Sequence, residues 1–136
     1  VEMSEKQIVS VYESYGSRKL IHNMLRAYIS PSMGEHSIDG IFTSSDHLAT
    51  IVQEELEEMG KRVPEDIQII GYDGLQFLNQ GKPIVSSIAQ PVHEIAKEAV
   101  RCLNELIANG KTEGNTKIPV SFQEGPTTKT LVTEEK

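Results

Sequence analysis

Apolar runs of strand length alternate along this chain with stretches in which apolar residues recur at helical spacing. Five short runs rich in apolar and β-branched residues predict strands, at residues 7–12, 40–44, 67–71, 84–88 and 118–122. Such alternation is typical of a parallel sheet with helices packed on both of its faces. The predicted fold class is therefore α/β.

Helical periodicity fills the intervals between these strands. Apolar pairs from Leu20/Ile21 to Tyr28/Ile29 predict a first amphipathic helix. A second helix is predicted over 47–59, where an apolar stripe is formed by Leu48, Val52, Leu56 and Met59. A third helix is predicted over 92–109, where the stripe is formed by Ile95, Ala99, Leu103 and Leu106. Gly60 and Gly110 stand where a left-handed cap commonly ends a helix.

Three of the predicted strands end in tripeptides that contain polar residues. They form the tripeptides Ser44-Ser45-Asp46, Tyr72-Asp73-Gly74 and Ala89-Gln90-Pro91. In open parallel α/β sheets, ligands bind in the crevice beyond the carboxyl ends of the strands. A hydroxyl, a carboxylate and an amide in one crevice suit a polyhydroxylated molecule, because each sugar hydroxyl both donates and accepts hydrogen bonds.

Each of these positions also has a structural interpretation. Ser45 or Asp46 would serve as the N-cap of the following helix, and we take Asp46 as structural. Asp73 and Gly74 are residues favoured in turns, whether or not a ligand is near. Gln90 would equally be an exposed residue before the proline that starts the third helix.

Composition and charge narrow the class of protein. The 136 residues suit one domain of ordinary size. With 13 Lys+Arg against 20 Asp+Glu, the net charge is −7, so this chain is not expected to bind DNA by itself. We expect a cytoplasmic protein that contacts no membrane, since no apolar run approaches a membrane span and residues 1–20 lack the order of a secretory signal.

The chain contains none of the common catalytic or metal-binding motifs. Its four histidines lack a paired metal spacing, and the single cysteine, Cys102, excludes an internal disulfide and a cysteine-based metal site. No serine lies in a nucleophile elbow, and no phosphate-binding or dinucleotide-binding glycine motif occurs. We therefore predict no enzyme activity, no catalytic residue, no metal and no cofactor.

Several motifs in a fixed order resemble one known family. They lie at residues 38–49, 60–67, 70–74 and 86–91, and continue at 118–120 and 125–128. Together they resemble the sensor domain of the lactose/galactose-repressor family of bacterial transcription regulators, over roughly residues 7–130. Within that family, the Tyr72-Asp73-Gly74 and Gln90-Pro91-Val92 motifs resemble those of regulators of sucrose genes.

The resemblance implies a periplasmic-binding-protein-like fold, in which two α/β lobes close on an effector. Residues 1–130 then form the C-terminal portion of the effector-binding domain, mostly its second lobe, and residues 131–136 form a tail. Helix 92–109 belongs to the first lobe in the intact protein. Without that lobe, we expect this helix to stay helical but to be poorly packed on its own chain, or packed on a neighbouring molecule.

The resemblance also assigns roles to individual residues. Asp73 matches an aspartate that holds sugar hydroxyls, and Gln90 matches a polar residue facing the cleft. Ser45 stands where many members have an asparagine that contacts the sugar, so the sequence departs from the pattern there. The aromatic residues of the family's site have no match in this sequence, so Tyr15 is chosen only by its place after the first predicted strand, where it would offer a stacking surface for a sugar. These four residues are the predicted ligand-binding set.

The partners implied by the resemblance are a small carbohydrate effector and operator DNA, the latter through an upstream helix-turn-helix domain. A homodimer is expected through helix 47–59 and residues 75–78, where Leu75, Phe77 and Leu78 gather apolar surface. Two other classes stay open. A sugar-binding protein of a transporter shares the lobes, and a receiver-like signalling domain also places a carboxylate at a strand end, although the acidic cluster and late lysine it needs are not evident.

Overall fold

Three helices and four strands occupy the part of the chain that the computed structural model describes, residues 18–29, 38–74, 83–112 and 115–130. In chain order they are α1 (Arg18–Ile29), β1 (Gly40–Phe42), α2 (Asp46–Glu58), β2 (Gln68–Asp73), β3 (Ser86–Ala89), α3 (Val92–Asn109) and β4 (Ser121–Gln123). The predicted strand at 7–12 lies outside the described residues. Every other predicted element is present, with ends shifted by a few residues.

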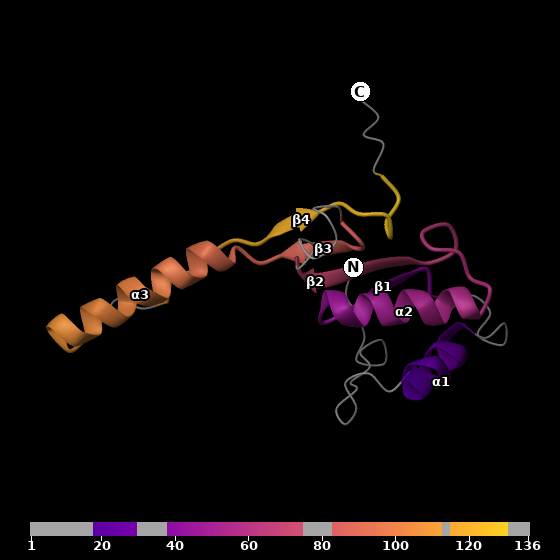
Figure 1. Cartoon of the computed structure of the whole chain (residues 1–136), viewed down its shortest axis with the longest axis horizontal. Helices are drawn as coiled ribbons and strands as arrows, with labels where there is room; N and C mark the ends of the chain where they lie inside the picture. The colour runs from indigo at the N-terminus through magenta and orange to yellow at the C-terminus, as the bar shows by residue number, and fades with distance from the viewer. Residues whose placement is uncertain (1–17, 30–37, 75–82, 113–114, 131–136) are drawn as a thin grey trace.

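The strands form one sheet in the order β1-β2-β3-β4. β1, β2 and β3 run parallel, which confirms the α/β class and the parallel sheet. β4 differs from that expectation, because it pairs antiparallel with β3 at the edge. The reason is the path of α3, which leaves the carboxyl end of β3. The returning chain therefore re-enters the sheet at that end and must run backwards along β3 (Figure 1).

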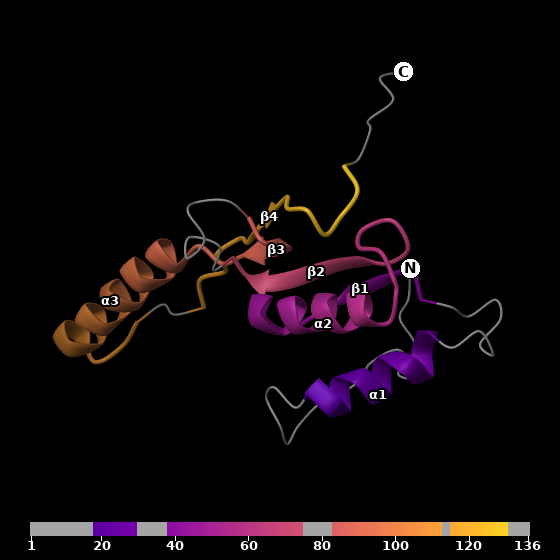
Figure 2. The ribbon, with the colours of Figure 1, turned by 45° about the vertical axis from the view of Figure 1, so that its right-hand side comes forward.

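One face of the sheet carries α2, and α1 lies against α2 (Figure 2). The apolar face of α2 is buried here through Ala49, Val52 and Leu56. Ile69 of β2 and Val85, the residue before β3, are fully buried against α2, and Ile21 and Leu25 of α1 belong to the same cluster. α2 is held at its ends by an N-cap at Ser45 and by Gly60, whose φ is 75°.

At β1 and β2, the opposite face of the sheet is apolar and partly exposed in the described part of the chain, whereas Ser86 of β3 on that face is covered by the segment after β4. Because side chains alternate along a strand, Phe42 and Ile70 point away from the face that Ile41 and Ile69 present to α2. Phe42 is 62% exposed and touches Tyr72 edge to face, with 6.5 Å between ring centroids. Within the described residues, both covering helices therefore lie on one face.

The long helix α3 stands away from the sheet (Figure 1). None of its residues is buried, and its apolar side chains are exposed, from 40% at Ile95 to 76% at Ile107. Arg101 pairs along the helix with Glu98 and Glu105, and Gly110 caps the end. The expectation of a helix that is poorly packed on its own chain is confirmed.

A short segment after β4 returns to the sheet and ties β2 to β3. Thr127 is fully buried there. Its hydroxyl donates to the Ile69 carbonyl at 2.7 Å and accepts the Ser86 amide at 2.8 Å. The Ser86 hydroxyl donates to the Gly125 carbonyl and lies 2.6 Å from the Thr128 hydroxyl. These buried hydrogen bonds hold the amino-terminal ends of the two strands together.

Candidate ligand-binding site

The parallel register brings the three polar strand ends to one edge of the sheet. Asp73, the last residue of β2, is opposite Ala89, the last residue of β3. On the other side of β2, the Thr43 amide donates to the Ile70 carbonyl at 2.9 Å, which places the loop after β1 beside β2. This edge is where open α/β sheets bind their ligands.

Asp73 and Gln90 are in direct contact at this edge. The side-chain amide of Gln90 donates to Oδ1 of Asp73 at 2.8 Å, and its backbone N–H donates to the Asp73 carbonyl at 3.2 Å. Both residues are half-buried. Within the described part of the chain, Oδ2 of Asp73 has no hydrogen-bond partner. The pair therefore presents a carboxylate oxygen that can accept a hydrogen bond from a ligand, orientated by a neighbouring amide.

Ser45 has a structural role in addition to its place at the edge. Its hydroxyl accepts the Leu48 amide at 3.1 Å, so Ser45 is the N-cap of α2, one of the two caps the sequence left open. The hydroxyl proton still allows a hydrogen bond to be donated. Asp46, the first residue of α2, is buried and does not cap the helix. Tyr15 lies outside the described residues.

Sequence reasoning missed one polar residue under this edge. Ser87 of β3 is fully buried, and its hydroxyl contacts both Asp46 and the Gly74 amide. The only signal in the sequence was a pair of serines inside a strand that otherwise reads as apolar. Two serines in an apolar strand indicate buried hydroxyls, but the sequence does not show which groups they bind.

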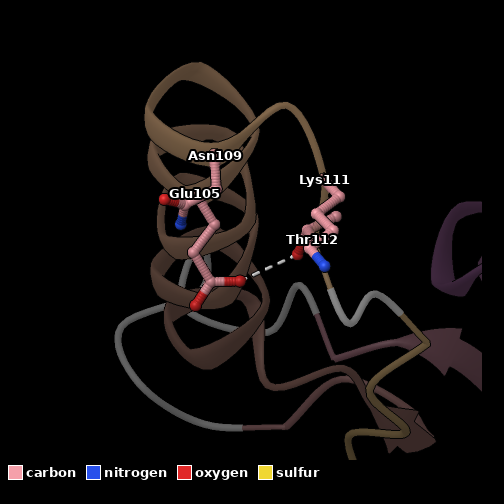
Figure 3. A pocket seen from close by; sticks show the side chains of 4 residues that line it. All are labelled: Glu105, Asn109, Lys111 and Thr112. Atoms are coloured by element: carbon pink, nitrogen blue, oxygen red, sulfur yellow. Dashed lines mark hydrogen bonds between the residues drawn. The ribbon is translucent and has the colours of Figure 1, made fainter.

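A hollow elsewhere on the molecule carries no comparable chemistry. It lies between the last turns of α3 and the chain that follows, lined by Glu105, Asn109, Lys111 and Thr112 (Figure 3). The Thr112 hydroxyl donates to Glu105 at 2.9 Å, and Glu105 also pairs with Arg101. Because its lining is exposed or half-buried and its polar groups bind one another, we place the site at the sheet edge instead.

Two further properties of the described residues bear on the class of site. Among them, no group of three histidine, cysteine, aspartate or glutamate side chains is arranged to hold a metal ion. No helix in this part of the chain is both long and apolar enough to cross a membrane.

Comparison with known proteins decides the family. The model of the periplasmic binding protein-like domain matches residues 3–128. The chain belongs to this family. Among its relatives in the family, the ribose operon repressor of Halalkalibacterium halodurans is 39% identical over 67 residues, which cover 49% of this chain and 20% of the relative. The sucrose operon repressor of Pediococcus pentosaceus is 31% identical over 99 residues, covering 71% of this chain and 30% of the relative.

Solved structures of family members agree with the fold. A LacI family transcriptional regulator from Arthrobacter sp. FB24, in complex with lactose, superimposes with a TM-score of 0.67 at 30% identity, covering 90% of this chain and 44% of that one. A LacI family regulator from Enterococcus faecium with bound ribose gives 0.60 at 30% identity, covering 83% and 41%. The resemblance to the lactose/galactose-repressor family is confirmed. The chain spans less than half the length of these relatives.

Proposed function

We propose that this chain is the C-terminal part of the sugar-sensing domain of a bacterial transcription repressor. A small carbohydrate bound between two lobes would change the affinity of the whole protein for its operator. The observation that carries this proposal is the hydrogen-bonded pair of Asp73 and Gln90 at the carboxyl edge of the sheet. Relatives that are repressors of ribose and sucrose operons support it.

The chemistry of the edge fits a sugar better than a charged or apolar ligand. Asp73 offers a hydrogen-bond acceptor and Ser45 a donor, and the Gln90 amide has both types of group. Neighbouring hydroxyls of a sugar need this mixture, because each donates one proton and accepts in return. In this proposal Asp73 and Gln90 contact the sugar directly, Ser45 borders the site, and Tyr15 provides a stacking surface.

In the proposed two-lobe protein, α3 packs in the first lobe and the rest of residues 1–130 forms the second. The exposed apolar side of α3 supports this placement, because such a surface on an acidic domain normally has a partner. Operator DNA would be bound by an upstream helix-turn-helix domain, since this chain has a net charge of −7. A repressor acting on DNA would reside in the cytoplasm and need no enzyme activity.

The homodimer through helix 47–59 and residues 75–78 stays a prediction. The apolar side chains of α2 face the core, and its exposed positions include Glu54, Glu57 and Glu58. Residues 75–78 lie outside the described part of the chain. Sedimentation of the chain at micromolar concentration tests the dimer, and a single monomeric species would contradict it.

Calorimetry on the full two-lobe protein tests sugar binding, with ribose, sucrose and lactose as ligands. For a sugar that binds, Asp73→Ala should weaken binding by roughly 1.5–3 kcal/mol, the usual value of a hydrogen bond to a charged group. Asp66→Asn is the matched control, because Asp66 pairs with Arg62 in the turn before β2, at the opposite end of that strand. An unchanged dissociation constant in Asp73→Ala would remove Asp73 from the site.

A further inference from the structure

The backbone at the end of β2 adopts a conformation that L-residues rarely take. The φ of Asp73 is 116°, and that of Gly74 is 73°. A non-glycine residue in this region persists only where surrounding contacts hold it, and such positions cluster at functional sites. The contacts that hold Asp73 therefore decide where its carboxylate points.

Among the described residues, hydrogen bonds from two side chains, Gln90 and Ser87, hold this turn. The first set comes from Gln90, which binds the Asp73 carbonyl and carboxylate and is itself part of the candidate site. The second comes from Ser87 of β3, whose hydroxyl accepts the Gly74 amide at 3.1 Å. Ser87 is fully buried, so this contact approaches the turn from the interior of the protein.

The direction of the second set follows from which groups can donate. A backbone N–H can only donate, so the Ser87 oxygen accepts from Gly74. The one proton of the Ser87 hydroxyl then goes to Oδ1 of Asp46, 2.5 Å away. The Asp46 carboxylate fixes the rotation of this hydroxyl and leaves its lone pair facing the Gly74 amide. We call Asp46, Ser87 and the Gly74 amide the relay.

The absence of a side chain at Gly71 allows the relay to form. A Cβ at this position would lie 2.4 Å from Oδ1 of Asp46 and 3.1 Å from its Cα. A Cβ at Gly74 would likewise lie 2.6 Å from the Cβ of Ala89. Two glycines therefore permit the start of α2 and the end of β3 to approach β2 closely enough for Asp46 to reach Ser87.

We propose that Ser87 and Asp46 are positioning residues of the sugar site, which hold the Asp73 carboxylate in its binding direction through the Gly74 amide. Both are buried beneath the turn, so they act through Asp73 and not by contact with the sugar. This inference rests on the proposed function for the role of Asp73. The relay itself can be tested without any sugar.

The first test is amide hydrogen exchange in the chain, with Gly74 measured relative to Ile69. The Ile69 amide is bonded to the Thr127 carbonyl in the core and reports overall opening. Ser87→Ala should speed exchange at Gly74 about tenfold more than at Ile69, because the loss of a buried acceptor is local. If the ratio of the Gly74 exchange rate to the Ile69 exchange rate is the same in Ser87→Ala as in the unchanged protein, the relay is overturned.

Ser86→Ala is the matched control for this test. Ser86 is the neighbouring serine, is equally buried and uses its hydroxyl as fully, but with Gly125 and Thr128. Its loss should speed exchange at Ile69 at least as much as at Gly74, because Thr127, which accepts the Ile69 amide, lies between Gly125 and Thr128. A selective effect on Gly74 in Ser86→Ala would overturn the proposal. If Ser87→Ala fails to fold, Asp46→Asn takes its place, and there the Gly74 ratio should also rise, since the neutral amide orientates the hydroxyl less strongly.

The second test is a double-mutant cycle on sugar binding in the two-lobe protein, with ribose, sucrose and lactose. Ser87→Ala should weaken binding of the active sugar about tenfold on its own, and should cause no further loss in the Asp73→Ala background. Equal losses in both backgrounds would mean that Ser87 does not act through Asp73. If no sugar binds the unchanged protein, the proposed function fails, and the exchange ratio still decides the relay.

Discussion

Leu56 and Leu103 give a matched pair of substitutions that tests how α3 is packed. Leu56 of α2 is fully buried, whereas Leu103 of α3 is 56% exposed. Leu56→Ala should destabilise the chain by about 2–5 kcal/mol, because it removes buried methyl groups and leaves a cavity. Leu103→Ala leaves no cavity. Full burial of a leucine side chain contributes about 1.5–3 kcal/mol, and Leu103 loses less than half of this; alanine also has a slightly higher helix propensity than leucine. We expect a cost under about 1 kcal/mol.

Urea unfolding followed by circular dichroism measures both changes, at two protein concentrations. Equal costs for Leu56→Ala and Leu103→Ala, independent of concentration, would refute the reasoning, because α3 would then bury its apolar side on its own chain. A concentration-dependent cost for Leu103→Ala would indicate a second copy as its partner. In the two-lobe protein, Leu103→Ala should cost about 2–5 kcal/mol, as for a core leucine. A cost that stays small there would contradict the placement of α3 in the first lobe.

Two further predictions concern two glycines with positive φ and the charges of α3. Gly74→Ala should lower the urea midpoint more than Gly110→Ala, since both have positive φ but only Gly74 has Ala89 within 2.7 Å of the new Cβ; equal shifts would contradict this. The hydrogen bond from the Arg101 guanidinium lowers the pKa of Glu98 to about 2. The ion pair of Glu98 with Arg101 therefore stabilises α3 fully above the ordinary carboxyl pKa, and this stabilisation is lost as the pH falls toward 2. A carboxyl NMR titration should show that midpoint, and Arg101→Met should raise it; an unshifted midpoint would contradict the pairing.

Local patterns in the sequence were enough to predict the elements and their order. The stripe of α2 and the glycines at 60 and 110 predicted helix ends that the structure confirms to within a residue or so. The proximity of Asp73 and Gln90 also followed, because both lie at the carboxyl ends of strands of a parallel sheet, which meet at one edge. The helix ends depend on residues a few positions apart, and the proximity of Asp73 and Gln90 depends on the general geometry of parallel sheets.

Contacts between distant residues were decided by the tertiary structure alone. Ser87 and Asp46 are 41 positions apart, and their hydrogen bond depends on how closely α2 approaches β2 and on the register of β3. The sequence predicted a turn at Asp73 and Gly74, but the positive φ of Asp73 appears only in the structure. The antiparallel direction of β4 likewise depends on where α3 leaves the sheet. Spacing along the chain specifies which face a residue occupies, whereas the residue it meets there is set by how the elements pack.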